Sequence, residues 1–224
     1  MTRRSAILWC GLALAPALGA TPSRAPGQRA ISGVASAAFV DYRVGAGSGV
    51  ERFNGAVLGL GGAARVGPRT TVGVTVQGGT LEPRRTADLE RRFGDITVDA
   101  RFSVAPWFAL TGGGSVRAVA NDVARQRWVL VRFGGEARPA FMGTPMRAIL
   151  RVGMIPVVAV SGLPAPALAL HAAAGLEYNR GPLTLAASYG VERFDFPPRS
   201  GIRRLEQVSA VTLRAGLRLR GVER

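Results

Sequence analysis

One stretch of the sequence decides the fold class: residues 95–104, which read D-I-T-V-D-A-R-F-S-V. Apolar and polar side chains alternate through it without a break, and the apolar ones are Ile96, Val98, Ala100, Phe102 and Val104. Because successive side chains of a strand point to opposite faces, this period of two predicts a β-strand with one apolar and one charged face. The stretch has about the length, roughly 9–11 residues, that a tilted strand needs to cross a bilayer.

The same alternation recurs along most of the chain, between glycine- and proline-rich turns. It predicts further strands at 31–44, 53–66, 70–81, 107–120, 128–137, from Met146 onward, and at 167–178, 183–192 and 205–220. Pro156 should end the strand that starts at Met146 or mark a bulge, because proline cannot donate to the ladder. We therefore predict an all-β fold, an antiparallel up-and-down transmembrane barrel of ten strands, with eight as the alternative count.

The face opposite the apolar one carries arginines together with carboxylates. In a narrow barrel these charges would point inward and would need to pair with one another. We expect this of Asp95, Asp99, Arg101, Arg117, Arg132, Glu136, Arg147, Arg151, His171, Glu177, Glu192, Arg214 and Arg218.

Most aromatic residues lie at or near the ends of predicted strands. Aromatic side chains favour the two interfaces of a bilayer, so the sequence predicts that these residues form girdles there. The residues are Tyr42, Phe53, Phe93, Trp107, Trp128, Tyr178, Phe194 and Phe196.

The connections alternate in length, as short periplasmic turns and longer outer loops do. Turns are short after the second, fourth and eighth strands, whereas longer polar loops are expected at 45–51, 82–92 and 194–204. The expected outer loops hold basic residues that could bind lipopolysaccharide phosphates, or could be ordinary solvated loop charges. They are Arg84, Arg85, Arg199, Arg203 and Arg204.

Residues 1–20 have the pattern of a secretory signal peptide. Arg3 and Arg4 precede an apolar run, and Ala17 and Gly19 have the small-residue spacing of a cleavage site. The only cysteine, Cys10, lies within this segment, so we expect a mature chain without disulfides or thiol chemistry. Residues 21–30 are interpreted as a short leader and 31–224 as the barrel.

The formal charge is +15, and the chain has arginines but no lysine. A basic balance can indicate nucleic-acid binding, but these cations are spread along the chain and no nucleic-acid-binding motif accompanies them. We expect no nucleic-acid partner.

The last strand, together with the signal peptide, carries a resemblance. Residues 214–220 read R-A-G-L-R-L-R and are similar to the C-terminal strand that bacterial outer-membrane β-barrel proteins present to their insertion machinery. The family usually ends in an aromatic residue, whereas this chain continues as G-V-E-R. The resemblance implies a monomer in the bacterial outer membrane, in contact with membrane lipid and with the barrel-insertion machinery.

No complete catalytic, cofactor-binding or metal-ligating constellation is visible in the sequence. His171 is the only histidine, and neither a serine two residues on nor an adjacent aspartate accompanies it, as outer-membrane hydrolases would require. We expect a structural role, a narrow passive pore or a surface-binding protein. The alternatives are an outer-membrane enzyme acting on lipid A or peptides, and a soluble secreted lipocalin-like or sandwich binder. A transmembrane helix over 152–176 is disfavoured by its three prolines.

Overall fold

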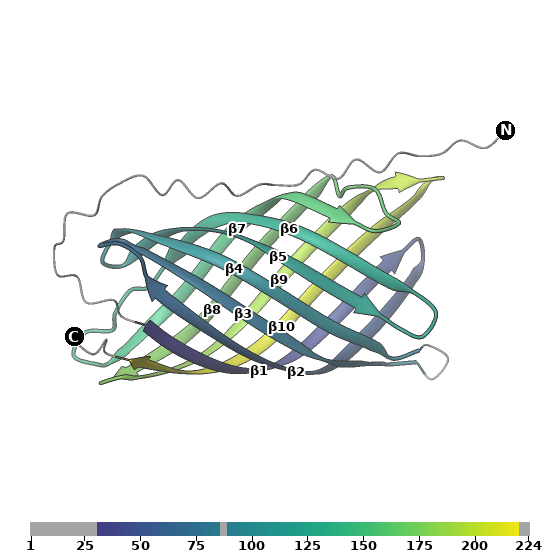
Figure 1. Cartoon of the computed structure of the whole chain (residues 1–224). Coiled ribbons are helices and arrows are strands. Elements are labelled where there is room, and N and C mark those ends of the chain that lie inside the picture. Colours follow the sequence, from purple (N-terminus) through teal and green to yellow (C-terminus); the bar gives the residue numbers. More distant parts are fainter. Residues whose placement is uncertain (1–30, 86–88, 220–224) are drawn as a thin grey trace, which may run out of the picture.

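Ten antiparallel strands follow one another around a closed barrel in the computed structural model, which describes residues 31–85 and 89–219 (Figure 1). The predicted ten-stranded all-β barrel is therefore confirmed. The strands are β1 (Ile31–Ala46), β2 (Gly49–Arg65), β3 (Thr70–Pro83), β4 (Arg91–Ala105), β5 (Phe108–Ala120), β6 (Arg125–Ala137), β7 (Met146–Val160), β8 (Leu168–Arg180), β9 (Leu183–Arg199) and β10 (Ile202–Leu219).

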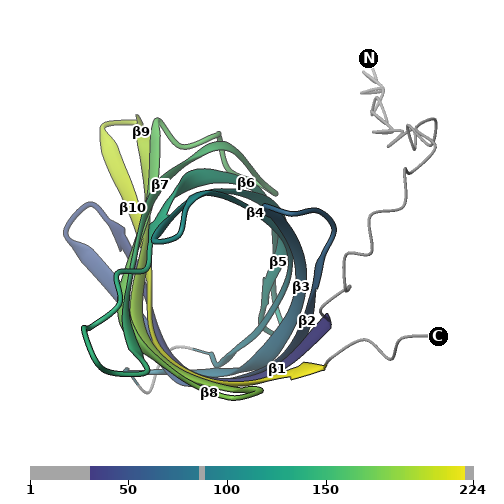
Figure 2. The same cartoon turned by 90° about the vertical axis from the view of Figure 1, so that its left-hand side faces the viewer.

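The barrel closes where β1 pairs with β10, in a register that runs from Ile31 opposite Leu219 to Ala46 opposite Arg204. A sandwich would instead need two sheets packed face to face. The sandwich alternative is therefore wrong for this chain. We call the end where β1 begins and β10 finishes the terminal end, and the opposite end the hairpin end; Figure 2 looks onto the terminal end.

Strand β4 shows how the period of two sorts the side chains. Ile96 and Val98 are 52% and 47% exposed on the outer face. Asp95, which directly precedes Ile96, is 3% exposed on the inner face. The outward residues of β4 stay apolar from Gly94 to Val104, and Arg92 is the first outward charge. The exposed apolar side chains thus form a belt around the barrel, as lipid contact would require.

Two of the expected long loops are strands instead. β1 and β2 continue to a turn of only Gly47 and Ser48, and β9 and β10 continue to Ser200 and Gly201. Both Ser200 and Gly201 have positive φ, 51° and 76°, which a two-residue type I′ turn requires. The predicted loops at 45–51 and 194–204 are therefore wrong, because tight turns let both hairpins extend past the apolar belt. The longer connection after β3 is present.

Pro156 marks a bulge, as its missing N–H predicted. Val131 pairs with Val157 and Phe133 with Met154, so β7 carries an extra residue at this point. The strand then continues to Val160 with its side-chain alternation shifted, which places both Ile155 and Val158 inside.

The expected signal peptide and leader lie outside the described residues. Among those that the structure describes, no helix is long and apolar enough to cross a membrane. The stretch 152–176 is divided between β7, a connection and β8.

Candidate functional site: the interior of the barrel

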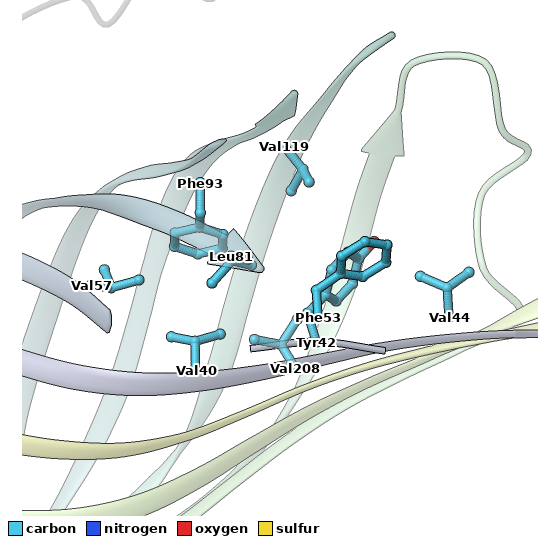
Figure 3. Close-up of a cluster of buried hydrophobic side chains, with 9 residues drawn as sticks. All are labelled: Val40, Tyr42, Val44, Phe53, Val57, Leu81, Phe93, Val119 and Val208. Carbon is cyan, nitrogen blue, oxygen red and sulfur yellow. The ribbon is translucent and has the colours of Figure 1, made fainter. Parts of the chain in front are cut away.

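Apolar side chains fill one wall of the interior near the hairpin end. Tyr42, Phe53 and Leu81 are among the nine buried residues of a cluster contributed by β1 to β5 and β10 (Figure 3). Phe53 is 1% exposed although its side chain points into the barrel. A water-filled channel at this level would expose such side chains, so this part of the interior is packed and dry.

A second apolar cluster lies on the other wall, on β6 to β9. The Trp128 ring packs against Phe194 at a centroid distance of 4.9 Å and against Phe196 at 6.1 Å. Trp128 and Leu130 are 2% and 0% exposed. The two clusters together fill the hairpin-end half of the interior, which we call the sealed half.

This arrangement corrects the predicted aromatic girdles. Six of the eight aromatics are buried inside the sealed half: Tyr42, Phe53, Phe93, Trp128, Phe194 and Phe196. Trp107 is 58% exposed at the terminal end, and Tyr178 shares the outward parity of Leu176. The reason is visible in the alternation itself: Phe93 shares the parity of Asp95, and Trp128 that of Arg132, so both must face inward.

An ion-pair network crosses the middle of the barrel. Arg117 on β5 lies 2.9 Å from Asp95 through Nε and 2.7 Å from Glu192 on β9 through a terminal nitrogen. Arg132 on β6 reaches the same Glu192 at 2.7 Å and donates to Ser115 at 2.7 Å. Since β5 and β9 are not neighbours in the sheet, these bonds tie opposite walls together.

A second network centres on Glu136, which is 1% exposed. One of its carboxylate oxygens accepts from Arg101 at 2.8 Å and from Arg138 at 2.7 Å, and the other accepts from Arg151. Arg138 also reaches Glu177 at 3.0 Å. The sequence reasoning missed Arg138 because it placed it in a connection, although its spacing of two from Glu136 keeps the inward parity.

Four of the expected interior charges behave differently. By register Asp99, Arg147, Arg214 and Arg218 face inward near the terminal end, yet all four are exposed to water. Among the described residues none of them has an ion-pair partner within 4.0 Å. We call this water-accessible part of the interior the open half.

His171 lies between the two networks, inward on β8 and opposite Glu192 in register. Its Nε2 is buried and, among the described residues, has no hydrogen-bond partner. It lies directly over Gly153, where an added Cβ would collide with the ring. Glu192 is already bound by two arginines, so the histidine has no free carboxylate beside it to orient it as a catalytic base.

The expected outer-loop arginines are divided by the structure. Arg84 and Arg85 are exposed just beyond β3, and Arg199 is exposed at the end of β9. Arg203 and Arg204 are strand residues rather than loop residues: Arg203 pairs with Asp195, and Arg204 points inward and binds Glu206 at 2.6 Å. Arg204 was therefore wrongly grouped with the outer basic residues.

A basic patch forms at the hairpin end over β1, β2 and β3. Arg43 and Arg52 are register partners on the outer face, and the Arg84 N–H donates to the Arg52 carbonyl oxygen at 2.9 Å. Asp41 accepts from both Arg43 and Arg52. Partial burial works against ionisation of Asp41, but these hydrogen bonds outweigh it and hold the pKa of the carboxyl below its usual value.

Within residues 31–85 and 89–219, no three histidine, cysteine or acidic side chains gather as a metal site would need.

Known proteins resemble this chain in fold only. No protein-family model and no curated protein matches it. Solved structures that resemble it include the translocator domain of the autotransporter NalP from Neisseria meningitidis (14% identity, TM-score 0.44, covering 84% of this chain and 88% of that one). Neisserial surface protein A gives 11% identity and a TM-score of 0.40 over 85% and 99% of the two chains. The outer-membrane protease OmpT from Escherichia coli gives 7% identity and a TM-score of 0.48 over 85% of this chain and 97% of that one.

The closed barrel that the sequence predicted is shown by the strand pairing of the chain itself. At these identities the likeness concerns the fold alone.

Proposed function

We propose that this protein is a monomeric barrel of the bacterial outer membrane, closed to passage, with a structural and surface-binding role and no enzymatic activity. The apolar belt supports the membrane location, since side chains such as Leu58 and Leu60 (67% and 70% exposed) would be unfavourable in water. Secretion through a signal peptide and insertion by the barrel-insertion machinery follow from that location as parts of the proposal.

The sealed half is the single observation that supports a barrel closed to passage. Inward side chains on all sides of the barrel are inaccessible to water at this level, including Leu81, Leu130, Phe194 and Glu206, each 0% exposed. Small barrels are commonly filled by their own side chains. A narrow passive pore, which the sequence left open, is therefore less well supported than a closed barrel.

Closure predicts that the protein, reconstituted in a planar bilayer, gives no steady ion conductance above that of the bare membrane. The physical reason is that an ion would have to enter a dry apolar layer without hydration or counter-charge. Steady single-channel currents from the unmodified protein would contradict the proposal.

Single cysteines provide a residue-level check of the same closure. Val57→Cys lies in the sealed half, and Arg218→Cys lies in the open half. A charged, water-soluble thiol reagent should modify the first at least about tenfold more slowly than the second, because reactivity follows exposure of the thiolate. Cys10→Ser serves as the parent chain.

The surface-binding role rests on the basic patch of Arg43, Arg52 and Arg84. We propose that the terminal end faces the periplasm, where an even-stranded barrel leaves both chain ends, so that the hairpin end meets the outer leaflet. Asp41 neutralises only part of the charge of the patch. Guanidinium groups at the edge of the apolar belt are suited to bind lipopolysaccharide phosphates by charge-assisted hydrogen bonds.

The double substitution Arg43→Ala with Arg84→Ala should weaken binding of purified lipopolysaccharide to the detergent-solubilised barrel by about tenfold, because it removes one or two charge-assisted hydrogen bonds to phosphate. The measurement is titration calorimetry at low salt. Arg69→Ala, which removes an exposed arginine from the terminal-end turn between β2 and β3, is the matched control and should bind as the parent does. Equal losses in the two variants would reduce the role of the patch to general charge attraction.

A further inference from the structure

We propose that the open half of the barrel binds a small oxyanion, a phosphate or sulfate group, between Arg214 on β10 and the arginines that surround Glu136. This inference goes beyond the proposed function, because neither closure nor lipopolysaccharide binding requires a ligand inside the barrel.

The charges around Glu136 do not balance. Three guanidinium groups, those of Arg101, Arg138 and Arg151, contact this one carboxylate. Within residues 31–85 and 89–219, only Arg138 has a second carboxylate, Glu177, within reach. The cluster of five side chains therefore carries an excess positive charge. In the confined interior of a barrel such an excess is unfavourable unless an anion or water screens it.

The arginines of this cluster also have unused donors. Arg101 and Arg151 bind Glu136 through Nε, which leaves the two terminal nitrogens of each group for another acceptor. Their side chains are 25% and 33% exposed, so water reaches them. A guanidinium fork with free terminal nitrogens matches the geometry of a phosphate or sulfate group.

Arg214 brings a further charge to the same region from the facing side of the sheet. It lies within electrostatic range of Arg138 and Arg151 and of the carboxylates Asp99 and Glu136. Among the described residues it has no ion-pair partner, and it is exposed to water. An arginine held near two other arginines without a carboxylate of its own is stabilised when an anion lies between them.

The neighbouring wall presents hydroxyl groups to the interior. The inward residues of β2 and β3 at this level are small, and include Gly59, Gly61 and Gly73. Beside them Ser36 and Thr75 present hydroxyl groups: a Cβ on Gly59 would come within 2.7 Å of the Ser36 Oγ, and one on Gly61 within 2.9 Å of the Thr75 Oγ1. Hydroxyl groups can donate to an oxyanion that the arginines attract.

The size and charge of the site select the class of ligand. The sealed half closes the interior on one side, so a long polyanion could not pass through, and a cation would meet the excess of arginine. Asp99 lies over Gly73 in the same half, with 3.1 Å between its Oδ1 and the position of a Cβ on that glycine, and it has no ion-pair partner in the part of the chain that the structure describes. Its negative charge should weaken anion binding and keep it reversible.

The test is titration of the detergent-refolded protein with inorganic phosphate, followed by phosphorus NMR. Arg214→Ala should weaken binding about tenfold, since it removes a charge-assisted contact, and Arg214→Lys should recover part of the loss as a point charge. Asp99→Asn should strengthen binding several-fold, because it removes the opposing charge. The last variant keeps the test decisive if Arg214→Ala does not fold.

Arg127→Ala is the control, because it removes an equal charge from the outer face at the hairpin end. No phosphate binding at millimolar concentration, or equal weakening by Arg127→Ala and Arg214→Ala, would overturn the proposal. A short-chain phosphatidylglycerol that binds more tightly than inorganic phosphate would identify a lipid headgroup as the source of the oxyanion, and equal affinity would identify the free anion. The experiment contains no lipopolysaccharide and measures no conductance, so its failure leaves the proposed function untouched.

Discussion

Replacing Glu136 with glutamine should destabilise the folded barrel by about 3 kcal/mol, near the lower end of the cost of breaking a buried ion pair. The carboxylate is 1% exposed and holds three guanidinium groups from separate strands and the β6–β7 connection. Without its charge, Arg101, Arg138 and Arg151 would repel one another. The arginines keep partial contact with water, which is why the lower end of the range applies. Urea unfolding in lipid vesicles, read from tryptophan fluorescence, measures the change.

The matched control is Glu51→Gln, which removes a carboxylate that is 52% exposed and pairs with Arg91 at 2.7 Å. A solvent-exposed ion pair contributes about 1 kcal/mol or less, so this variant should unfold almost as the parent does. The double variant Glu136→Gln with Arg151→Gln should recover part of the lost stability, because it removes one of the repelling charges. Equal stability of Glu136→Gln and Glu51→Gln would show that the network contributes little.

Val98→Arg should cost about 2–4 kcal/mol, the price of an arginine on the lipid face near the middle of a bilayer. Val98 is 47% exposed, in the middle of the outward apolar run of β4, and pairs with the equally outward Val74. The cost arises because the guanidinium must be desolvated or must draw water into the hydrocarbon. The same vesicle unfolding assay gives the value.

Thr80→Arg is the control for depth, since Thr80 is outward on β3 and lies beside Arg92, at the edge of the belt. There the cost falls to about 0–1 kcal/mol. If both variants unfold at the same urea concentration, the apolar belt does not lie in lipid and the membrane location is wrong.

Periodicity alone was enough for the all-β class and for the direction of most side chains. In residues 95–104 the alternation predicted outward Ile96 and Val98 and inward Asp95 and Asp99, and the structure places them so. The bulge at Pro156 was also predictable, because a residue without an N–H cannot be accommodated in a regular ladder. Local rules of this kind need no knowledge of the partner strand.

The aromatics show where the sequence reasoning failed. Their position near strand ends suggested membrane interfaces, yet the parity of Phe93, Trp128 and Phe194 was the stronger signal and points inward. The strands also extend beyond the apolar belt at the hairpin end, so a residue near the end of a predicted strand was not at the edge of the belt. Following the alternation through the tight turns at Gly47 and Ser200 would have found both errors.

The sequence by itself determined that this chain forms strands with one apolar and one charged face, because that property depends only on spacing along the chain. Which charges meet was decided by the tertiary structure alone. Arg117 and Glu192 are far apart in sequence and lie on strands that do not pair, and only closure of the barrel with its particular register brings them to 2.7 Å. The same closure leaves Arg214 and Asp99 exposed in the open half and without an ion-pair partner among the described residues, since the curvature of the barrel fixes which inward side chains can reach across it.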